Sequence, residues 1–291
     1  MPEEVIRDLT LDGLTFSYRL LRQPDSCTEP VIVLGGVLQG MRGWPQMEDH
    51  VLPHASLITA DLPGMGGADP PRPEHDSELL CTAVDRIIDD LGAPRVNLFG
   101  YSYGSVIAFT CAQRRPQRIA RLLLGGLPVH ISEAQYAHWR RATDRLVAGD
   151  LEDFAELAAE GMLCLDESRP VHRRHLAYRY VKRSFLQAAT HTPDAKNVLD
   201  RSVTRRLSFT GGLPGVSTLV FCGEHDTVSS PEHQRDFAAG LQDGDFVTVD
   251  ESDHWVVLER PDAVADLTTR FFTGRPVQAA AAARGVVGAQ R

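Results

Sequence analysis

The chain has 291 residues, of which 43% are hydrophobic and 24% charged, as in ordinary globular proteins. That length allows one large domain, or one domain carrying a sizeable insertion. The formal net charge of −9 argues against nucleic acid as a partner, because a phosphate-binding surface needs an excess of basic residues.

The first part of the chain alternates strand-like and helix-like segments. A hairpin is predicted from residues 5–9 and 14–21, joined by an Asp-Gly turn. Short β-branched apolar runs, typical of strands buried on both faces, cover residues 30–34, 55–60, 95–100 and 119–124. Apolar residues at helical spacing predict helices at 77–91, capped by Asp76 or Ser77 and stopped by Gly92, and at 105–113. The alternation indicates a parallel α/β sheet.

From about residue 128 to residue 212 helix follows helix, at 132–147, 151–162, 171–189 and 197–207. Strands at 218–223 and 245–249 and helices at 231–241 and 262–272 then restore the alternation. The simplest account is one α/β domain, residues 1–127 and 213–273, with a helical insertion at 128–212. The low-complexity end, residues 274–291, is typical of a disordered tail.

The motif Gly100-Tyr-Ser-Tyr-Gly104 lies where a predicted buried strand ends and a helix begins. There it makes a sharp turn that strains the serine backbone and lifts the side chain above the sheet. The glycines are needed because side chains would collide with the neighbouring strand and helix. The five-residue pattern alone also suits an ordinary glycine-rich turn. Its strand-to-helix context favours Ser102 as a nucleophile.

A serine hydroxyl is a poor nucleophile without a base within hydrogen-bond reach. His254 follows the last predicted strand, at the sheet edge where the loop after residues 95–100 should also lie. Three carboxylates are candidates for the acid that orients the histidine. Glu224 and Asp226 follow the strand at 218–223, and Asp253 adjoins His254. The residues alone leave this choice open.

Acyl transfer also requires hydrogen-bond donors for the oxyanion of the tetrahedral intermediate. The backbone N–H of Tyr103, directly after the serine, is expected to supply one. The loop after residues 30–34 is expected to supply the second, which we assign to Val37. The adjacent pair Gly35-Gly36 has a simpler interpretation, in which the glycines merely permit a turn.

Taken together, these pieces resemble the α/β-hydrolase superfamily over about residues 28–272. The matching pieces are Gly35-Gly36 before Trp44, Asp61-Leu-Pro-Gly-Met-Gly, Gly100-Tyr-Ser-Tyr-Gly104, Gly223-Glu-His-Asp226 and Asp253-His254. The resemblance implies a mostly parallel central sheet flanked by helices, with residues 128–212 as an all-helical lid. It also implies a Ser102–His254–Asp226 triad and no metal or organic cofactor. Many relatives carry His-Gly at Gly35-Gly36, so the shape of this loop is expected to differ.

The fold does not fix the reaction. The stretch around Gly35 to Trp44 resembles hydrolases attached to bacterial secondary-metabolite pathways, and a serine nucleophile argues against epoxide or haloalkane hydrolysis. We predict hydrolysis of an ester or thioester through an acyl-enzyme. The alternatives are an acyltransferase acting on carrier- or coenzyme A-bound acyl groups with the same triad, and a lactonase or carbon–carbon bond hydrolase. A further alternative, from a different functional class, is a non-catalytic ligand-binding protein on the same fold.

The predicted lid is expected to roof Ser102 and to set the range of small-molecule acyl substrates. Gly36, Trp139 and Trp255 are the predicted substrate-binding residues. Residues 169–183 hold six cationic side chains and no acidic one: Arg169, Arg173, Arg174, Arg179, Lys182 and Arg183. Such a run is typical of a solvated helix face. The alternative is a dock for an anionic substrate, such as coenzyme A or the phosphopantetheine arm of an acyl carrier protein.

Two further features concern the compartment. No basic stretch followed by an apolar one opens the chain, and no apolar run reaches the roughly 18 residues that span a bilayer. The five cysteines are odd in number and form no CxxC pair, which favours neither a zinc site nor a disulfide framework. A cytoplasmic location is the expectation that follows.

Overall fold

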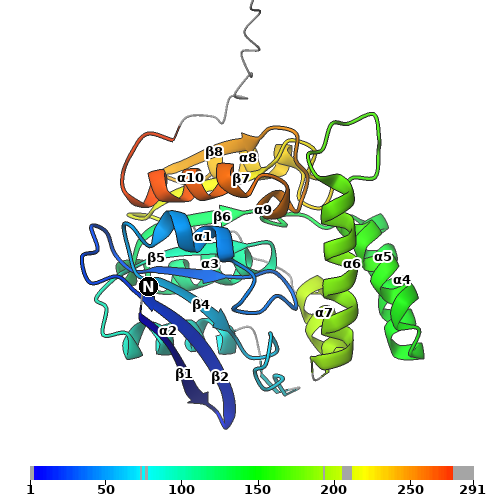
Figure 1. Ribbon diagram of the computed structural model, residues 1–291, viewed down its shortest axis with the longest axis horizontal. Coiled ribbons are helices and arrows are strands. Elements are labelled where there is room, and N and C mark those ends of the chain that lie inside the picture. The colour runs from blue at the N-terminus through cyan, green and yellow to red at the C-terminus, as the bar shows by residue number, and fades with distance from the viewer. Residues whose placement is uncertain (1–2, 73, 76–77, 193, 205–211, 278–291) are drawn as a thin grey trace, which may run out of the picture.

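The computed structural model describes residues 3–72, 74–75, 78–192, 194–204 and 212–277. These residues form one eight-stranded sheet in the order β1-β2-β4-β3-β5-β6-β7-β8 (Figure 1). The strands are β1 (Glu3–Leu11), β2 (Leu14–Arg22), β3 (Val31–Leu34), β4 (Leu57–Asp61), β5 (Val96–Tyr101), β6 (Ile119–Gly125), β7 (Ser217–Gly223) and β8 (Gly244–Val249). Each lies within two residues of its predicted ends.

The sheet is parallel from β4 through β8 and ends in an antiparallel ribbon of β1 and β2. The ribbon turns at Asp12 and Gly13, both at positive φ (51° and 73°), as a two-residue hairpin loop requires. The predicted fold class, a mostly parallel sheet flanked by helices, is confirmed.

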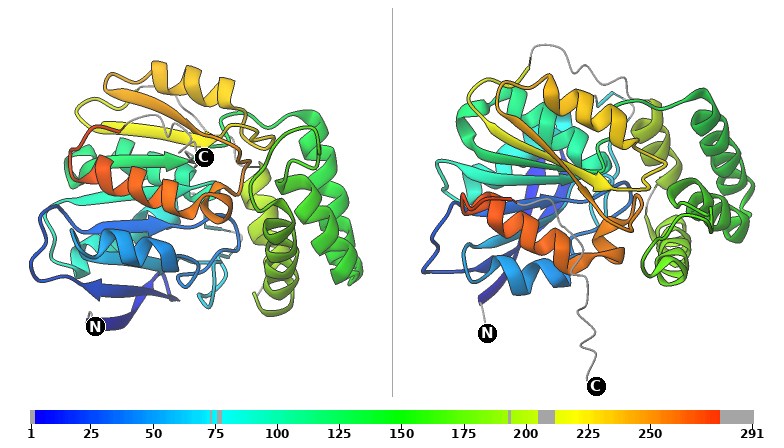
Figure 2. Two further views of the ribbon diagram at one scale, coloured as in Figure 1. Left: turned by 45° about the horizontal axis from the view of Figure 1, so that its top comes forward. Right: turned by 90° about the horizontal axis from the view of Figure 1, so that it is seen from above.

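Helices cover both faces of the sheet (Figures 1 and 2). One face carries α2 (Glu78–Asp90), α3 (Tyr103–Arg114) and α8 (Pro231–Ala239), and the other carries α1 (Pro45–Val51) and α10 (Pro261–Phe272). In β3, Ile32 and Leu34 join the first layer whereas Val31 and Val33 join the second. Burial on both faces explains why these strands are continuous apolar runs in the sequence.

Two short helices, α1 and α9 (Val256–Glu259), have no counterpart among the predicted elements. A helix of seven or four residues is too short to show a repeating apolar face. At the helix predicted over 77–91, the proposed caps Asp76 and Ser77 lie outside the described residues. Gly92 follows α2 at a φ of 64°, in keeping with its predicted role as a stop.

Between β6 and β7 the chain forms α4 (Glu133–Ala148), α5 (Leu151–Met162), α6 (Arg174–His191) and α7 (Ala195–Thr204), which lie beside the carboxyl ends of the strands (Figures 1 and 2). Ser132 and Gln135 form a reciprocal capping box that starts α4. The four helices bury a core of their own around Phe154, Val181 and Phe185. This separate core explains why the helices have clear apolar faces although they do not pack on the sheet.

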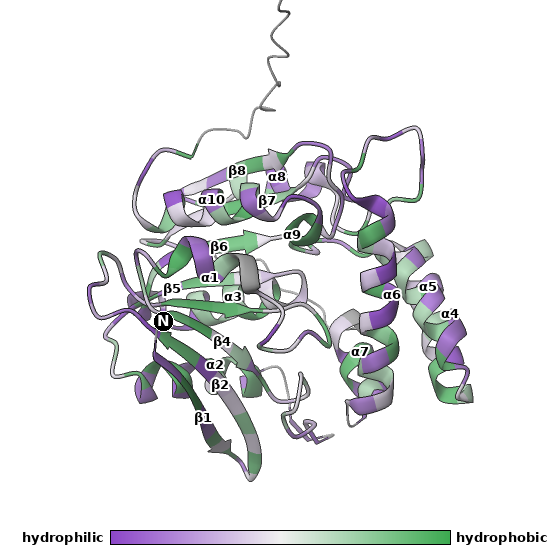
Figure 3. Cartoon of the chain, viewed as in Figure 1, coloured by the Kyte–Doolittle hydropathy of each residue, from purple (hydrophilic) through white to green (hydrophobic). Residues whose placement is uncertain are grey.

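Residues 205–211, at the end of the predicted lid, and residues 278–291 of the predicted tail lie outside the described residues. Among the residues that are described, no helix combines the length and the apolarity needed to cross a bilayer. Hydrophobic residues concentrate in the central strands, whereas hydrophilic segments recur along α4 and α6 (Figure 3).

Candidate active site

Loops at the carboxyl ends of four parallel strands meet beside the helical insertion. Ser102 follows β5, Gly126 follows β6, Asp226 lies beyond β7 and His254 lies beyond β8. Because the strands are parallel, these ends share one edge of the sheet, the usual place for a ligand site in such folds.

The turn at Ser102 has the strained geometry that the motif predicts. Ser102 lies at φ 52° and ψ −119°, a conformation that residues other than glycine rarely adopt. A Cβ atom at Gly100 would lie 2.4 Å from the carbonyl oxygen of Gly104, and one at Gly104 would lie 2.2 Å from that of Leu34. Neither distance is tolerable, so both positions require glycine. The turn is held by the Ser102 N–H, which donates to the Gly125 carbonyl at 2.7 Å.

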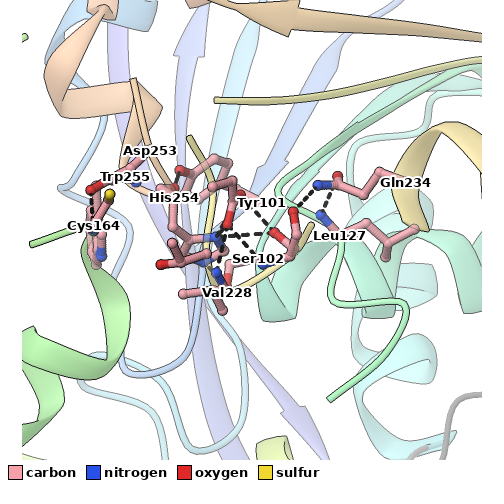
Figure 4. Close-up of polar contacts among 12 residues, drawn as sticks. Tyr101, Ser102, Leu127, Cys164, Val228, Gln234, Asp253, His254 and Trp255 are labelled. Atoms are coloured by element: carbon pink, nitrogen blue, oxygen red, sulfur yellow. Dashed lines mark hydrogen bonds and ion pairs between the residues drawn. The ribbon is translucent and has the colours of Figure 1, made fainter. Parts of the chain in front are cut away.

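Three residues predicted from the sequence come together in one hydrogen-bonded line. Ser102 Oγ lies 3.0 Å from His254 Nε2 (Figure 4). On the other side of the ring, His254 Nδ1 lies 3.0 Å from Asp226 Oδ2. Asp226 and His254 are 5% and 1% exposed, so water competes little with these bonds.

The structure shows which of the three candidate carboxylates contacts His254. Glu224 turns away and accepts the backbone N–H of Glu251 at 3.1 Å. The two oxygens of Asp253 accept backbone N–H groups, from Cys164 at 2.7 Å and from Trp255 at 2.9 Å. Of the three, Asp226 is the carboxylate in contact with the imidazole.

Ser229 is a member of this cluster that the sequence analysis missed. Its hydroxyl donates to Asp226 Oδ2 at 2.7 Å and lies 3.2 Å from His254 Nδ1. The backbone N–H groups of Val228 and Ser229 donate to Asp226 Oδ1 at 2.9 and 2.8 Å. The sequence hid this role because Ser229-Ser230-Pro231 has the composition of a helix cap, which Ser230 is for α8.

Gln234 anchors the loop that carries Ser229. Its buried amide accepts the N–H of Leu127 at 2.9 Å and donates to the carbonyl of Ser229 at 2.6 Å. The loops after β6 and β7 are therefore tied together, and Figure 4 shows Gln234 and Leu127 beside each other on one side of His254.

Tyr101 holds the main chain of the histidine, because its hydroxyl donates to the His254 carbonyl oxygen. Burial raises the pKa of Tyr101 well above its ordinary value, so the hydroxyl keeps its proton. At His254 burial disfavours the charged imidazolium, but the charge and hydrogen bond of Asp226 outweigh it. The net effect raises the pKa of His254 above 6.5.

The loop after β3 closes on itself through Gln39. The Gly36 N–H donates to Gln39 Oε1 at 2.9 Å, and the Gln39 N–H donates to the Gly36 carbonyl at 3.1 Å. Within the described residues the N–H of Val37 makes no hydrogen bond, and Leu38 is held at a φ of 60°. A Cβ atom at Gly36 would lie 3.4 Å from Ser102 Cβ, which shows how closely this loop approaches the serine.

A pocket of about 520 Å³, including its mouth, opens over Ser102. It is lined by Val37, Ser102, Tyr103, Pro128, Ile131, Gln135, Trp139, Met162, Leu199, Ser202 and Val228. The sheet domain and the helical insertion both contribute, and no lining residue in the described part of the chain is charged. This is the composition of a site for an apolar ligand.

The three predicted substrate-binding residues take different places. Trp139 lines the pocket, whereas Gly36 lies against Ser102 outside the lining set. Trp255 packs in the core of the helical insertion, with its ring centroid 6.4 Å from that of Tyr180.

The six cationic residues of the basic segment do not form one surface. Arg174 donates to the carbonyl oxygens of Asp166 and Arg169 at the start of α6, and Lys182 pairs with Glu156 on α5. These two side chains therefore serve the local structure of the insertion.

The outward stripe of α6 consists of Leu176, Arg179, Tyr180 and Arg183, which recur at helical spacing. Leu176 and Tyr180 are 52% and 42% exposed, and both arginines are exposed as well. The stripe thus combines apolar and cationic side chains in a chain whose net charge is −9.

Comparison with known proteins places the fold in a family. The family model described as alpha/beta hydrolase fold matches residues 29–261. A haloalkane dehalogenase of Mesorhizobium japonicum is 23% identical over 261 residues, covering 80% of this chain and 81% of that protein. A 2-hydroxy-6-oxononadienedioate/2-hydroxy-6-oxononatrienedioate hydrolase of Cupriavidus pinatubonensis is 32% identical over 103 residues. That match spans 34% of this chain and 36% of that protein's length.

Among solved structures, the enol-lactonase from Burkholderia xenovorans superposes with a TM-score of 0.77 at 20% identity. The match covers 92% of this chain and 100% of that one. At this identity the likeness concerns the fold, and the three relatives differ in the reactions that their names give. The family model, in contrast, spans most of the sequence: the chain belongs to the alpha/beta hydrolase fold family.

Proposed function

We propose that the chain is a serine hydrolase that cleaves an ester or thioester through an acyl-enzyme on Ser102. The observation that carries this proposal is the line of hydrogen bonds from Ser102 Oγ through His254 to Asp226, beneath an apolar pocket. An uncharged hydroxyl, a base and a buried carboxylate in this order are what nucleophilic acyl transfer requires.

In the first half of the reaction, Ser102 Oγ attacks the acyl carbon while its proton moves to His254 Nε2. Asp226 holds the imidazole so that Nδ1 keeps its hydrogen and Nε2 is free to accept the proton. The N–H groups of Val37 and Tyr103 then stabilise the oxyanion, aided by the positive end of α3. His254 returns the proton to the departing alcohol or thiol, which leaves an acyl-serine.

In the second half, water takes the place of the leaving group. His254 removes a proton from the water as its oxygen attacks the acyl carbon, and the same oxyanion donors stabilise the second intermediate. Collapse of that intermediate releases the carboxylic acid, and the proton on His254 returns to Ser102.

Carbon–carbon bond hydrolysis is a second candidate, favoured by the match to the dienedioate hydrolase. A dienedioate carries two carboxylates, and burying a carboxylate without a cation beside it is expensive. The lining residues that the structure describes include no Lys or Arg, which supports an uncharged acyl group instead. If the protein cleaved a dienedioate faster than any ester, carbon–carbon bond hydrolysis would be the better supported function.

Matched oxoester and thioester substrates with acyl chains of increasing length test the proposal, with Ser102→Ala as the control. Ser102-dependent release of either product supports hydrolysis, and the faster series identifies the natural leaving group. A stable acyl-Ser102 with little release would instead indicate an acyltransferase awaiting an acceptor. Absence of Ser102-dependent turnover across both series would contradict the proposal.

The pH profile offers an independent check of the base. Because His254 must be neutral to accept the proton and its pKa is raised, kcat/KM is expected to fall on the acid side with a midpoint above pH 6.5. The pKa of His254 is shifted upward because the negative charge of Asp226 favours the protonated imidazole. Initial rates with an activated ester from pH 5 to 9 give the midpoint, and a value at or below 6.5 would contradict this assignment.

For the partner, we propose that the outward stripe of α6 docks the acidic surface of an acyl carrier protein. The support is charge complementarity, since Arg179 and Arg183 flank the exposed Leu176 and Tyr180 on an otherwise acidic protein. A membrane surface or free coenzyme A would engage the same charges less selectively.

The variant Arg179→Glu/Arg183→Glu is expected to raise KM for a carrier-bound acyl group about tenfold while leaving small esters unaffected. Arg140→Glu/Arg141→Glu, which reverses two exposed charges on α4, is the matched control. Steady-state kinetics with both substrate types measure the difference. Equal changes in the two variants, or equal effects on carrier-bound and small substrates, would exclude docking through α6.

A further inference from the structure

Two buried carboxyl groups lie directly beside the histidine loop and take no part in the proposed chemistry. Asp253 and Glu259 are both fully buried, and the Asp253 N–H donates to Glu259 Oε2 at 2.7 Å. Two carboxylates cannot both stay ionised at such a place without a cation between them, so the pair must share a proton.

The contacts show which of the two carries that proton. Each oxygen of Asp253 accepts a backbone N–H, from Cys164 and from Trp255, and an ionised carboxylate suits two donors best. Within the described residues no donor reaches Oε1 of Glu259, which is buried. Burial, followed by the charge and the side-chain hydrogen bond of Asp253, raises the pKa of Glu259 to about 9, although the backbone N–H of Asp253 acts in the opposite direction. Glu259 is therefore the protonated partner at neutral pH.

The bond to Cys164 gives the pair a role beyond the histidine loop. Cys164 follows Leu163, the C-cap residue of α5, and Met162, the last residue of α5, lines the pocket over Ser102. The side chain of Asp253 thus connects the helical insertion to the loop that carries His254. Figure 4 shows Cys164, Asp253 and Trp255 grouped on one side of His254, opposite Leu127 and Gln234.

We infer that Asp253 is a positioning residue that holds the His254 loop against the end of α5. Asp253 does so as an ionised carboxylate, and the neighbouring Glu259 is protonated. The imidazole is then aligned while the helical insertion is seated, and it loses its alignment when the insertion lifts. The inference rests on the proposed role of His254 for its kinetic test, whereas its test by unfolding is independent of any activity.

The titratable groups around the pair are few and belong to several elements. Asp226 comes from the loop after β7, Tyr101 from β5, and His254 from the same loop as Asp253. The charge of Asp226 acts in the same direction as that of Asp253 and raises the pKa of Glu259 further. His254 carries a positive charge only below its raised pKa, and above that pH none of these described neighbours supplies a positive charge that would let both carboxyl groups ionise.

The two members of the pair respond differently to isosteric substitution. Asp253→Asn puts an amide NH₂ against one of two backbone N–H donors, so kcat for p-nitrophenyl acetate is expected to fall about 10- to 100-fold as the imidazole shifts. Glu259→Gln still accepts the Asp253 N–H, and its NH₂ replaces the acid proton as a donor, so its loss is expected to be far smaller. Asp245→Asn, an exposed site on β8, is the control for removal of one charge.

The kinetic result that would overturn the inference is an equal loss in the two variants, or no loss in Asp253→Asn. A merely structural role would lower the melting temperature of both variants alike and leave kcat unchanged below the transition. If wild-type protein shows no Ser102-dependent turnover of the probe ester, the proposed function fails rather than the inference. In that case the second experiment alone decides.

That experiment measures the pH dependence of unfolding. Between the ordinary glutamate value of 4.5 and about 9, the folded state holds a proton on Glu259 that the unfolded chain has lost. Stability from this group is therefore full below pH 4.5 and declines as the pH rises toward 9. Denaturant titrations are expected to show this one-proton slope in wild type and Asp245→Asn and to lack it in Glu259→Gln. Equal slopes in wild type and Glu259→Gln would overturn the assignment of the proton.

Discussion

Replacing Ser102 with alanine is expected to lower kcat for p-nitrophenyl acetate by about 10⁴-fold or more. The substitution removes the oxygen that lies 3.0 Å from His254 Nε2 and leaves no other hydroxyl in its place. Alanine keeps the Cβ atom and suffers no more than serine from the φ of 52°, so the fold is expected to survive. What activity persists would come from the oxyanion donors and from binding alone.

Ser168→Ala, at an exposed serine, serves as the matched control for loss of a hydroxyl. Both variants are compared with wild type by steady-state kinetics and by thermal unfolding. Retention of more than about a tenth of wild-type kcat in Ser102→Ala would mean that another nucleophile performs the reaction. An unfolded Ser102→Ala protein would direct the same test to Ser102→Gly, which also lacks the hydroxyl and suits the φ of 52°.

Asp226→Asn is expected to lower kcat by about 10³- to 10⁴-fold, although the substitution is nearly isosteric. The two N–H donors from Val228 and Ser229 at Oδ1 oblige the asparagine to place its oxygen there. Its NH₂ group then faces His254 Nδ1, which must accept a hydrogen bond instead of donating one. The imidazole would carry its hydrogen on Nε2 and could not accept the proton of Ser102.

Comparison with Glu224→Gln makes this prediction specific to the acid. Glu224 is half exposed and bonds to the N–H of Glu251, so its substitution is expected to change kcat by less than about threefold. Kinetics of the two variants, with circular dichroism as a check of folding, measure the difference. A larger loss of kcat in Glu224→Gln than in Asp226→Asn would show that Asp226 is not the carboxylate that orients His254.

The fold and the position of the serine could be predicted because local rules act on them directly. Buried parallel strands are continuous apolar runs, and Gly100 and Gly104 have no room for a Cβ atom, so the constraint is written in the residues themselves. The helices of the insertion were equally visible, because each buries one face in a core of its own.

The choice of acid and the role of Ser229 could not be predicted in this way. Side-chain directions in a loop depend on turn geometry, so composition does not separate Glu224, Asp226 and Asp253. Ser229 and Gln234 act through contacts made across the fold, with His254 and Leu127 respectively. The basic segment shows the same limit, because the sequence could not tell that Arg174 and Lys182 are used within the insertion.

The most direct test of the acyl-enzyme account is the mass of the protein after reaction with a fluorophosphonate, followed by mapping of the modified peptide. The account predicts one adduct, on Ser102, formed quickly in wild type, slowly in His254→Ala and not at all in Ser102→Ala. A wild-type protein that stays unmodified while folded, or an adduct that forms equally well in Ser102→Ala, would contradict it.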